Sequence, residues 1–143
     1  MTIPYRIERI ETVQFAAFPE SNVVGQDIAI NTTVGFSIKS DLSNIRNTLK
    51  INYVQGEKLL LIVEINCYFA IDKEGVEAIK KKGNVPVDFL RYMGTISVGI
   101  ARGVIHVKTE GTTLNAVVLP PINLVEMIKT DFVLQESEKT TSD

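Results

Sequence analysis

The feature that most constrains this chain is the length of its alternating apolar stretches. From Lys58 to Ile71 nearly every odd position is apolar, and Asp27–Lys39 alternates in the same way. A period of two predicts strands with one buried face. A strand of about 14 residues spans roughly 45 Å, more than the diameter, below roughly 40 Å, of a compact chain this size. We therefore expect a bent or broad sheet with apolar surface left for a second subunit or another polypeptide to cover.

Two further stretches have the pattern of strands. Tyr5–Phe18 is the first, and because its apolar positions change parity after Ile7, we expect a β-bulge near Arg9. Asn47–Val54 is the third, and Gln55-Gly56 is expected to turn the chain into the strand that follows.

The stretch Val87–Thr109 has the period of a helix. Its apolar positions recur at steps of three and four, at Phe89, Met93, Ile96, Ile100, Val104 and Val107. Many of these residues are β-branched and would also suit strands, and each internal glycine costs a helix about 1 kcal/mol. Because strict alternation fails between Ile100 and Val104, we prefer the helix. The small residues on a second face predict close contact with another backbone.

The remaining segments are less regular. Residues 72–84 are polar, with a helical turn expected around Val76–Ile79. The segment Val117–Leu124 is apolar and is held extended by two prolines. We expect a single domain over residues 1–128 and a polar, disordered tail over residues 129–143.

Composition excludes several classes of function. The net charge of −2 argues against a nucleic-acid binder. No apolar run reaches the roughly 18–20 residues that span a membrane, and the start of the chain lacks a secretory pattern, so we expect a cytoplasmic protein.

Catalytic chemistry has little support. Cys67 and His106 are the single cysteine and histidine, so we expect no metal site and no cofactor. Cys67 alternates with apolar residues and is interpreted as a buried, inert thiol. A Cys67–His106 nucleophile–base pair is conceivable, but no flanking motif supports it. The Gly99–Gly103 spacing lacks the rest of a phosphate loop and favours helix packing. We do not expect an enzyme.

Four groups of residues, in their order along the chain, match the pattern of a known family. They are Ile7-Glu8-Arg9-Ile10 with Thr12; Leu49 to Glu64 followed by Phe69-Ala70-Ile71; Pro86, Leu90-Arg91-Tyr92 and Ala101-Arg102-Gly103; and Leu119-Pro120-Pro121-Ile122-Asn123-Leu124. Over most of Tyr5–Met127 the chain thereby resembles the SecB protein-export chaperones.

The resemblance implies an α+β fold with a long four-stranded antiparallel sheet, one long helix and a short C-terminal helix packed on it. It implies a homotetramer, a dimer of dimers, which binds unfolded or precursor polypeptides in apolar grooves without ATP and passes them to the SecA motor. Carried onto this sequence, the groove strand provides Val34, Phe36 and Ile38. Weaker candidates for client binding are Phe15, Phe18, Val117 and Leu119, and candidates for subunit contacts are Gly94, Gly99 and Gly103.

Two departures from the family bear on function. The acidic positions that dock SecA appear here as Gln14 and Phe18, which leaves Glu64. The segment between Gly103 and Pro120 is longer than in the family. The alternatives are a SecB-like protein dedicated to one client, such as an antitoxin, and a structural oligomer without chaperone activity. In the structural oligomer all apolar faces would be consumed by subunit contacts. Separately, Val34, Phe36 and Ile38 could be ordinary core under the helix.

Overall fold

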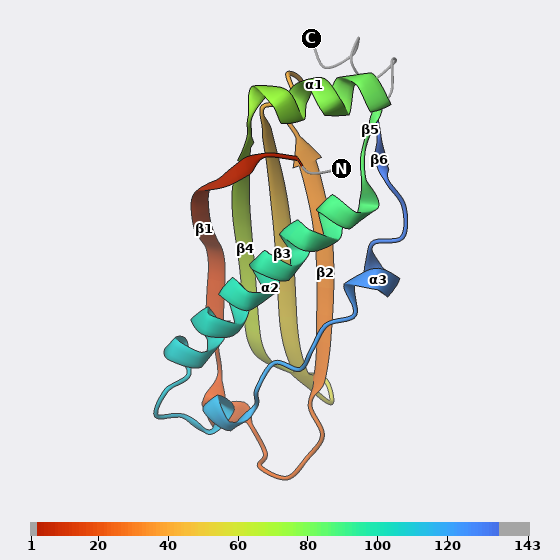
Figure 1. The fold of residues 1–143 in the computed structure, drawn as a ribbon. Helices are drawn as coiled ribbons and strands as arrows, with labels where there is room; N and C mark the ends of the chain where they lie inside the picture. The colour runs from red at the N-terminus through yellow and green to blue at the C-terminus, as the bar shows by residue number, and fades with distance from the viewer. Residues whose placement is uncertain (1–2, 135–143) are drawn as a thin grey trace.

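The structure is a computed structural model, and it describes residues 3–134. Its centre is an antiparallel sheet in the order β1-β4-β3-β2. The strands are β1 (Tyr5–Ala17), β2 (Ala29–Ile38), β3 (Asn44–Gln55) and β4 (Lys58–Ile71). The long helix α2 (Val87–Lys108) crosses one face of the sheet diagonally (Figure 1). The expected α+β architecture and the four strands are confirmed, each strand end lying within three residues of its prediction.

Alternation decides which side of the sheet is buried. Odd residues of β3 and most odd residues of β4 face α2 and form the core. The core has two parts. The α1-end core includes Ile45, Cys67, Phe69, Met93 and Leu124, and the η2-end core includes Leu49, Ile51, Val63, Ala101 and Leu119.

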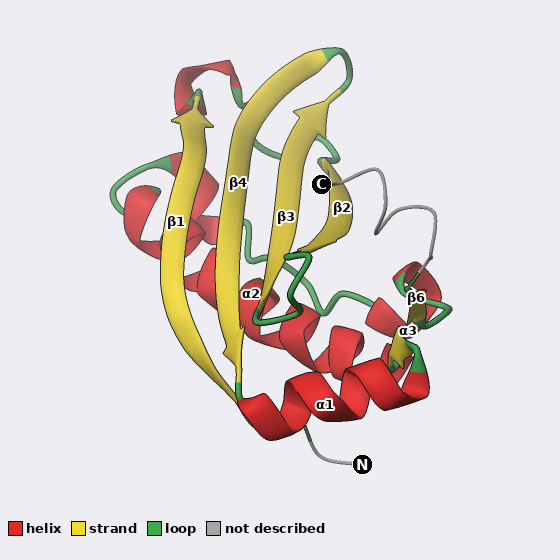
Figure 2. Ribbon diagram, turned by 90° about the horizontal axis from the view of Figure 1, so that it is seen from above, coloured by secondary structure: helices red, strands yellow, loops and turns green. Residues whose placement is uncertain are grey.

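The opposite face of the sheet, which we call the open face, is turned away from α2 (Figure 2). It is mostly polar: the cross-strand register brings Glu11, Asn66 and Thr48 together in one row. The expectation of a broad uncovered apolar face is therefore wrong for this side. The exposed apolar residues lie elsewhere, with Ile10 at 50% and Val107 at 64% exposure as examples.

The first strand contains the expected bulge and a second one. The register with β4 shifts between Ile7 and Arg9, as the parity change predicted, and again between Thr12 and Gln14. Each bulge adds a residue to one strand and increases its local bend and twist. The two bulges thus help a 13-residue strand to follow the curved sheet.

Helix α2 has nearly the predicted bounds, but a different face of it is buried. The buried positions are Leu90, Met93, Gly94, Ser97, Val98, Ala101 and Ile105, whereas the predicted face ends in the exposed Val107. Gly94, Ser97 and Ala101 share this inward face with larger residues such as Leu90 and Met93, and their small side chains let the helix backbone approach its neighbours closely, as predicted for the second face. Among residues 3–134, no helix combines the length and apolarity needed to cross a bilayer.

Two segments are more ordered than the sequence suggested. The polar residues after β4 form a full helix, α1 (Lys73–Lys82), in which Gly75 is required: a Cβ there would lie 2.7 Å from Ile71 and 2.8 Å from Ile3 side-chain carbons. Further on, β5 (Asn84–Val85) pairs with β6 (Phe132–Val133). The expectation that the tail begins at residue 129 is therefore wrong for residues 132–133, and residues 135–143 lie outside the described residues.

Three short helical pieces complete the fold. They are η1 (Pro19–Ser21), η2 (Thr113–Ala116) and α3 (Leu124–Met127), and the last is the expected short C-terminal helix. Leu124 is buried against α2, because Gly94 leaves room for it: a Cβ at Gly94 would lie 3.2 Å from Leu124 Cδ1.

Candidate functional site

Strand β2 forms one bare edge of the sheet. All ten of its residues pair with β3 in unbroken register, and none of them is charged. Within residues 3–134, no backbone hydrogen bond joins β2 to any segment other than β3. A long, unbroken, uncharged edge of this kind is the arrangement that natural sheets normally avoid, because it can pair with another chain.

The register shows which backbone groups point outward. The Lys39 N–H donates to the Asn44 carbonyl at 3.0 Å, one step beyond the Ile38–Ile45 pair. In an antiparallel pair the bonded positions alternate, so odd residues of β2 bond to β3. The even residues, Ile30, Thr32, Val34, Phe36 and Ile38, direct their N–H and C=O groups toward the free edge.

The same even residues carry the apolar row that the sequence predicted. Val34 lies opposite Leu49 and Ile38 opposite Ile45, both buried under α2, so the row faces the helix layer. Val34, Phe36 and Ile38 are each half-buried and pack against the α1-end core. They are neither fully open nor ordinary core, because β2 is the last strand of the sheet and only its inner side is covered.

The buried Asn47 fixes the position of β2. Its side chain lies within the α2-facing layer, opposite Phe36, and its Nδ2 donates to the Gly35 carbonyl at 3.0 Å. This added bond to the edge strand holds the apolar row in place.

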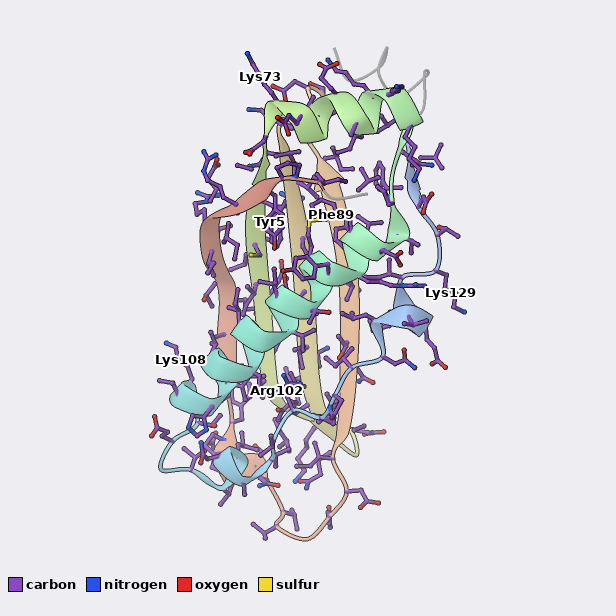
Figure 3. All side chains as sticks on the ribbon, in the orientation of Figure 1. Tyr5, Lys73, Phe89, Arg102, Lys108 and Lys129 are labelled. Atoms are coloured by element: carbon purple, nitrogen blue, oxygen red, sulfur yellow. The ribbon has the colours of Figure 1, made fainter. Side chains whose placement is uncertain are left out.

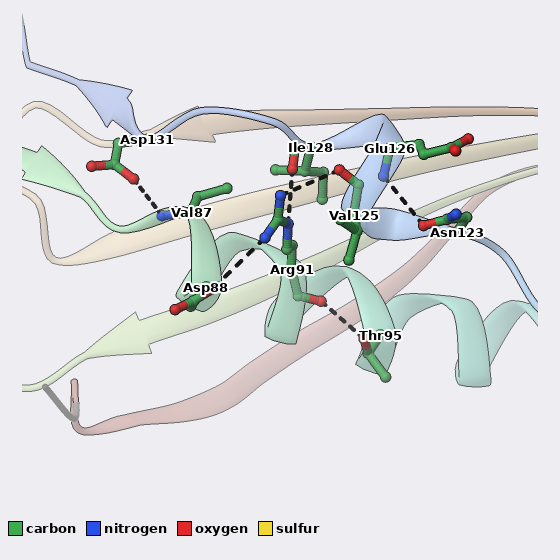
Figure 4. A network of polar contacts seen from close by, with 9 residues as sticks. All are labelled: Val87, Asp88, Arg91, Thr95, Asn123, Val125, Glu126, Ile128 and Asp131. Atoms are coloured by element: carbon green, nitrogen blue, oxygen red, sulfur yellow. Dashed lines mark hydrogen bonds and ion pairs between the residues drawn. The ribbon is translucent and has the colours of Figure 1, made fainter.

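The C-terminal segment Leu119–Ile128, which we call the strap, lies on the β2 side of α2 (Figure 1). Two arginines of α2 hold it. Arg91 donates to the Ile128 carbonyl at 2.8 Å and to the Val125 carbonyl at 3.2 Å (Figure 4). Arg102, labelled on α2 in Figure 3, is the second. It donates to the Leu119 and Pro120 carbonyls, both at 3.1 Å. Nothing in the local sequence pattern predicts this role of the arginines, although both belong to the stretches that carried the family resemblance.

The strap carries apolar side chains on both sides. Leu124 and Ile128 are buried and Ile122 is half-buried against the core that contacts the β2 row. Val125 is 60% exposed. The strap therefore adds exposed apolar surface on the side of α2 where the row of Val34, Phe36 and Ile38 lies.

The other edge of the sheet, β1, is protected. It has two bulges, and Arg6, Glu8, Arg9 and Glu11 place charges along its first half. Bulges and charges are common means of blocking edge-to-edge pairing. The two edges therefore differ, and β2 is the one open to an extended chain.

The structure does not bring all the predicted client-binding residues together. Phe15 and Phe18 belong to the β1 edge, which is the edge of the sheet opposite β2. Phe15 is half-buried beneath Lys108, whose Nζ lies 5.7 Å from the ring centre. Val117 is half-buried near Tyr53, which donates to its carbonyl at 3.4 Å. Leu119 is only 2% exposed, so its assignment as a client contact is wrong for this conformation: it fills the η2-end core.

The glycines of α2 also differ from one another. Gly94 contacts the chain's own strap, so it serves a contact within the subunit. At Gly99 and Gly103 a Cβ would meet nothing within 4 Å. These two lie on the exposed side of α2, and their assignment to a subunit contact stays a prediction.

Glu64, the remaining position for motor docking, is on the open face of β4. The register places Gln14 on one side of it and Lys50 on the other. One carboxylate beside a lysine is a weak match for an acidic docking surface.

No arrangement for catalysis was found among the described residues. Cys67 is fully buried, and its burial raises the pKa of the thiol, which suppresses the reactive thiolate. His106 is exposed near the end of α2. Within residues 3–134, no three His, Cys, Asp or Glu side chains come together in a way that could hold a metal ion.

Comparison with known proteins finds likeness at the level of structure. No protein-family model and no curated protein sequence matches the chain. Among solved structures, it is similar to the Mycobacterium tuberculosis SecB-like chaperone Rv1957, determined in complex with a ChAD peptide from the antitoxin HigA1. The TM-score is 0.52 with 12% sequence identity, over 83% of this chain and 90% of that one. The chain therefore has the fold of the SecB-like chaperones.

Proposed function

We propose that this protein is an ATP-independent holdase chaperone and that the β2 edge is where it binds extended, non-native polypeptides. One observation carries the proposal: the outward backbone groups and the half-buried apolar row belong to the same residues, Ile30 to Ile38. Binding of this kind needs no catalytic group.

An extended client would add to the sheet as a fifth strand. Its backbone would pair with the outward N–H and C=O groups of β2, which gives affinity without regard to sequence. Its alternate side chains would lie beside Val34, Phe36 and Ile38 and the exposed residues of the strap. Each apolar side chain buried in this way contributes about 1.5–3 kcal/mol before the ordering costs of association.

The similarity to a chaperone bound to an antitoxin peptide supports a second, narrower candidate: a chaperone dedicated to one client. Both candidates use the same edge, and they differ in selectivity. A general holdase binds many unfolded chains with similar affinity, whereas a dedicated one binds one segment far more tightly than the others.

We further propose that several copies of the chain assemble into an oligomer and that it acts in the cytoplasm. Ile7, Ile10 and Val13 on β1 are 44%, 50% and 47% exposed, which supports packing of a second copy of the chain against these side chains, not against the β1 backbone. We extend this assembly to a homotetramer as the complete form. Export through SecA is not part of the proposal, because Glu64 stands beside Lys50 in place of a cluster of acids.

The experiment compares two serine variants. Phe36→Ser removes the centre of the row, and Val107→Ser removes an apolar side chain that is 64% exposed near the end of α2, away from β2. Fluorescence anisotropy of a labelled, permanently unfolded protein such as reduced and carboxymethylated α-lactalbumin reports binding.

A buried Phe side chain covers roughly 200 Å², so the open part of Phe36 is on the order of 50 Å². At about 25 cal/mol per Å², its loss should weaken binding by about 1.3 kcal/mol, or roughly tenfold. Val107→Ser should leave the affinity within about twofold. Wild-type protein that binds no unfolded chain would favour the purely structural oligomer instead.

A further inference from the structure

A hollow of about 680 Å³ crosses the open face near the α1 end of the sheet. All four strands line it: Arg6 and Arg9 come from β1, Tyr68 and Ala70 from β4, Asn44 and Arg46 from β3, and Ser37 and Ile38 from β2. Lys39, just beyond β2, completes its rim. The hollow opens on the side opposite the helix layer; it reaches Ile38 at the end of the apolar row, whereas Val34 and Phe36 lie outside its lining.

The cross-strand register organises these residues into two rows. In one row Arg9 and Arg46 flank Tyr68, and in the next row Arg6 and Asn44 flank Ala70. The Arg9 guanidinium lies 4.3 Å from the centre of the Tyr68 ring. The hollow thus has a floor of Tyr68 and Ala70 with a cationic group on either side.

The charge of the hollow is opposite to that of the chain. Four cations, Arg6, Arg9, Lys39 and Arg46, line it together with one carboxylate, Glu8, which gives 4 − 1 = +3. The whole chain carries −2. A local excess of positive charge on an acidic protein marks a surface for a negatively charged partner.

The positive charge is only partly compensated from within. The distance from Arg6 Nη2 to Glu8 Oε2 is 3.9 Å, and that from Arg9 Nη2 to Glu11 Oε1 is 4.0 Å. Both ion pairs are long and exposed to solvent. Within residues 3–134, Arg46 and Lys39 take part in no ion pair. Two further carboxylates stand beside the hollow without lining it: Glu11, which accepts from Asn66 and Tyr68, and Asp41, which accepts from Ser43. They offset part of this positive charge from outside the hollow.

We propose that this hollow binds an acidic, extended segment of a partner polypeptide. Four strands at about 4.8 Å spacing give a width near 15 Å, which suits roughly four extended residues. Carboxylates at the two ends of such a segment would meet Arg6 and Arg9 on one side and Arg46 and Lys39 on the other. Tyr68 and Ala70 provide the less polar floor that a peptide's aliphatic carbons can contact.

A nucleic acid fits this surface less well. Its regular line of phosphates is matched by a continuous basic stripe, whereas here the cations stand in two groups, and Glu8 accompanies one of them.

The test measures binding of a fluorescein-labelled peptide rich in Glu and Asp, at low ionic strength, by fluorescence anisotropy. The double variant Arg6→Ser/Arg46→Ser removes one cation from each side of the hollow. Lys50→Ser is the matched control, because Lys50 is also on the open face of β3 but outside the hollow. Controls for the ligand are the same peptide with Gln and Asn for the acids, and a short single-stranded oligonucleotide.

The wild-type protein should bind the acidic peptide, with affinity that falls as salt is added. The double variant should bind about tenfold more weakly, the effect expected for two exposed charge pairs, and Lys50→Ser should bind within about twofold of wild type. Phe36→Ser should leave this binding unchanged, which separates the hollow from the client site. No binding of the acidic peptide, equal binding of the neutral one, equal loss in Lys50→Ser, or tighter binding of the oligonucleotide would each overturn the proposal.

Discussion

Two neighbouring proline substitutions test the geometry of the β2 edge. Thr33 is an odd residue, so its N–H bonds to β3 opposite Lys50. Thr33→Pro removes that bond and pushes the proline ring against β3, and we expect it to lower the free energy of unfolding by roughly 2–4 kcal/mol. Thr32 is an even residue with its N–H at the free edge, where proline is tolerated. Thr32→Pro should cost only about 1 kcal/mol.

The same pair separates stability from client binding. Thr32→Pro removes an outward donor and places a ring where a fifth strand would approach, so binding of the unfolded α-lactalbumin should weaken by about tenfold or more while the protein stays folded. Urea denaturation followed by circular dichroism gives the stabilities, and anisotropy gives the affinities. Equal stabilities for the two variants would show that the alternation of bonded positions is misassigned. Undiminished binding by Thr32→Pro would show that clients do not pair with this edge.

Changes at three other sites, Gly94, Gly99 and Cys67, test the remaining packing. Gly94→Val should lower the free energy of unfolding by about 1–3 kcal/mol, because its Cβ would lie 3.2 Å from Leu124 Cδ1; an unchanged urea midpoint would mean that the strap is not packed there. Gly99→Ala should stabilise an isolated subunit by roughly 0.8–1 kcal/mol through helix propensity, since nothing lies within 4 Å of the added Cβ. Gly99→Leu should change the mass measured by light scattering if α2 helices pack together in the oligomer. A constant mass would show that Gly99 is not in the subunit contact. Cys67, buried and with a raised pKa, should resist iodoacetamide at neutral pH in the folded protein and react fully in guanidinium chloride, and rapid alkylation of the native protein would contradict its burial.

Local patterns predicted the sheet well, because alternation reports directly on which face of a strand is buried. The parity change after Ile7 even located a bulge. The strand order could not be predicted from local patterns. Nothing in residues 29–38 indicates that their strand lies at an edge, because that depends on whether β1 pairs with β4 or with β2. The proposal that Val34, Phe36 and Ile38 contact clients depends on the position of β2 at the edge of the sheet.

Other elements were missed for reasons of packing. The inward face of α2 was predicted only in part: Gly94, Ser97 and Ala101 were expected to allow close contact and are buried, whereas Gly99 and Gly103, expected to do the same, are exposed. Helix α1 looked polar because only one of its sides touches the core, through Gly75 and Ile79. Leu119 was expected to contact clients, but its side chain fills the core, and Arg102, 17 residues away, donates to its carbonyl.

The most direct test of the β2 edge is amide hydrogen exchange, resolved residue by residue by NMR, with and without an unfolded client. In the free protein the outward amides of Ile30, Thr32, Val34, Phe36 and Ile38 should exchange rapidly, while Asn31, Thr33, Gly35 and Ser37 are already protected by β3. On addition of client, the even amides should become protected and the odd ones should change little. If client binding protects other surfaces and leaves the even amides of β2 exchanging as before, the β2 edge is not the client site.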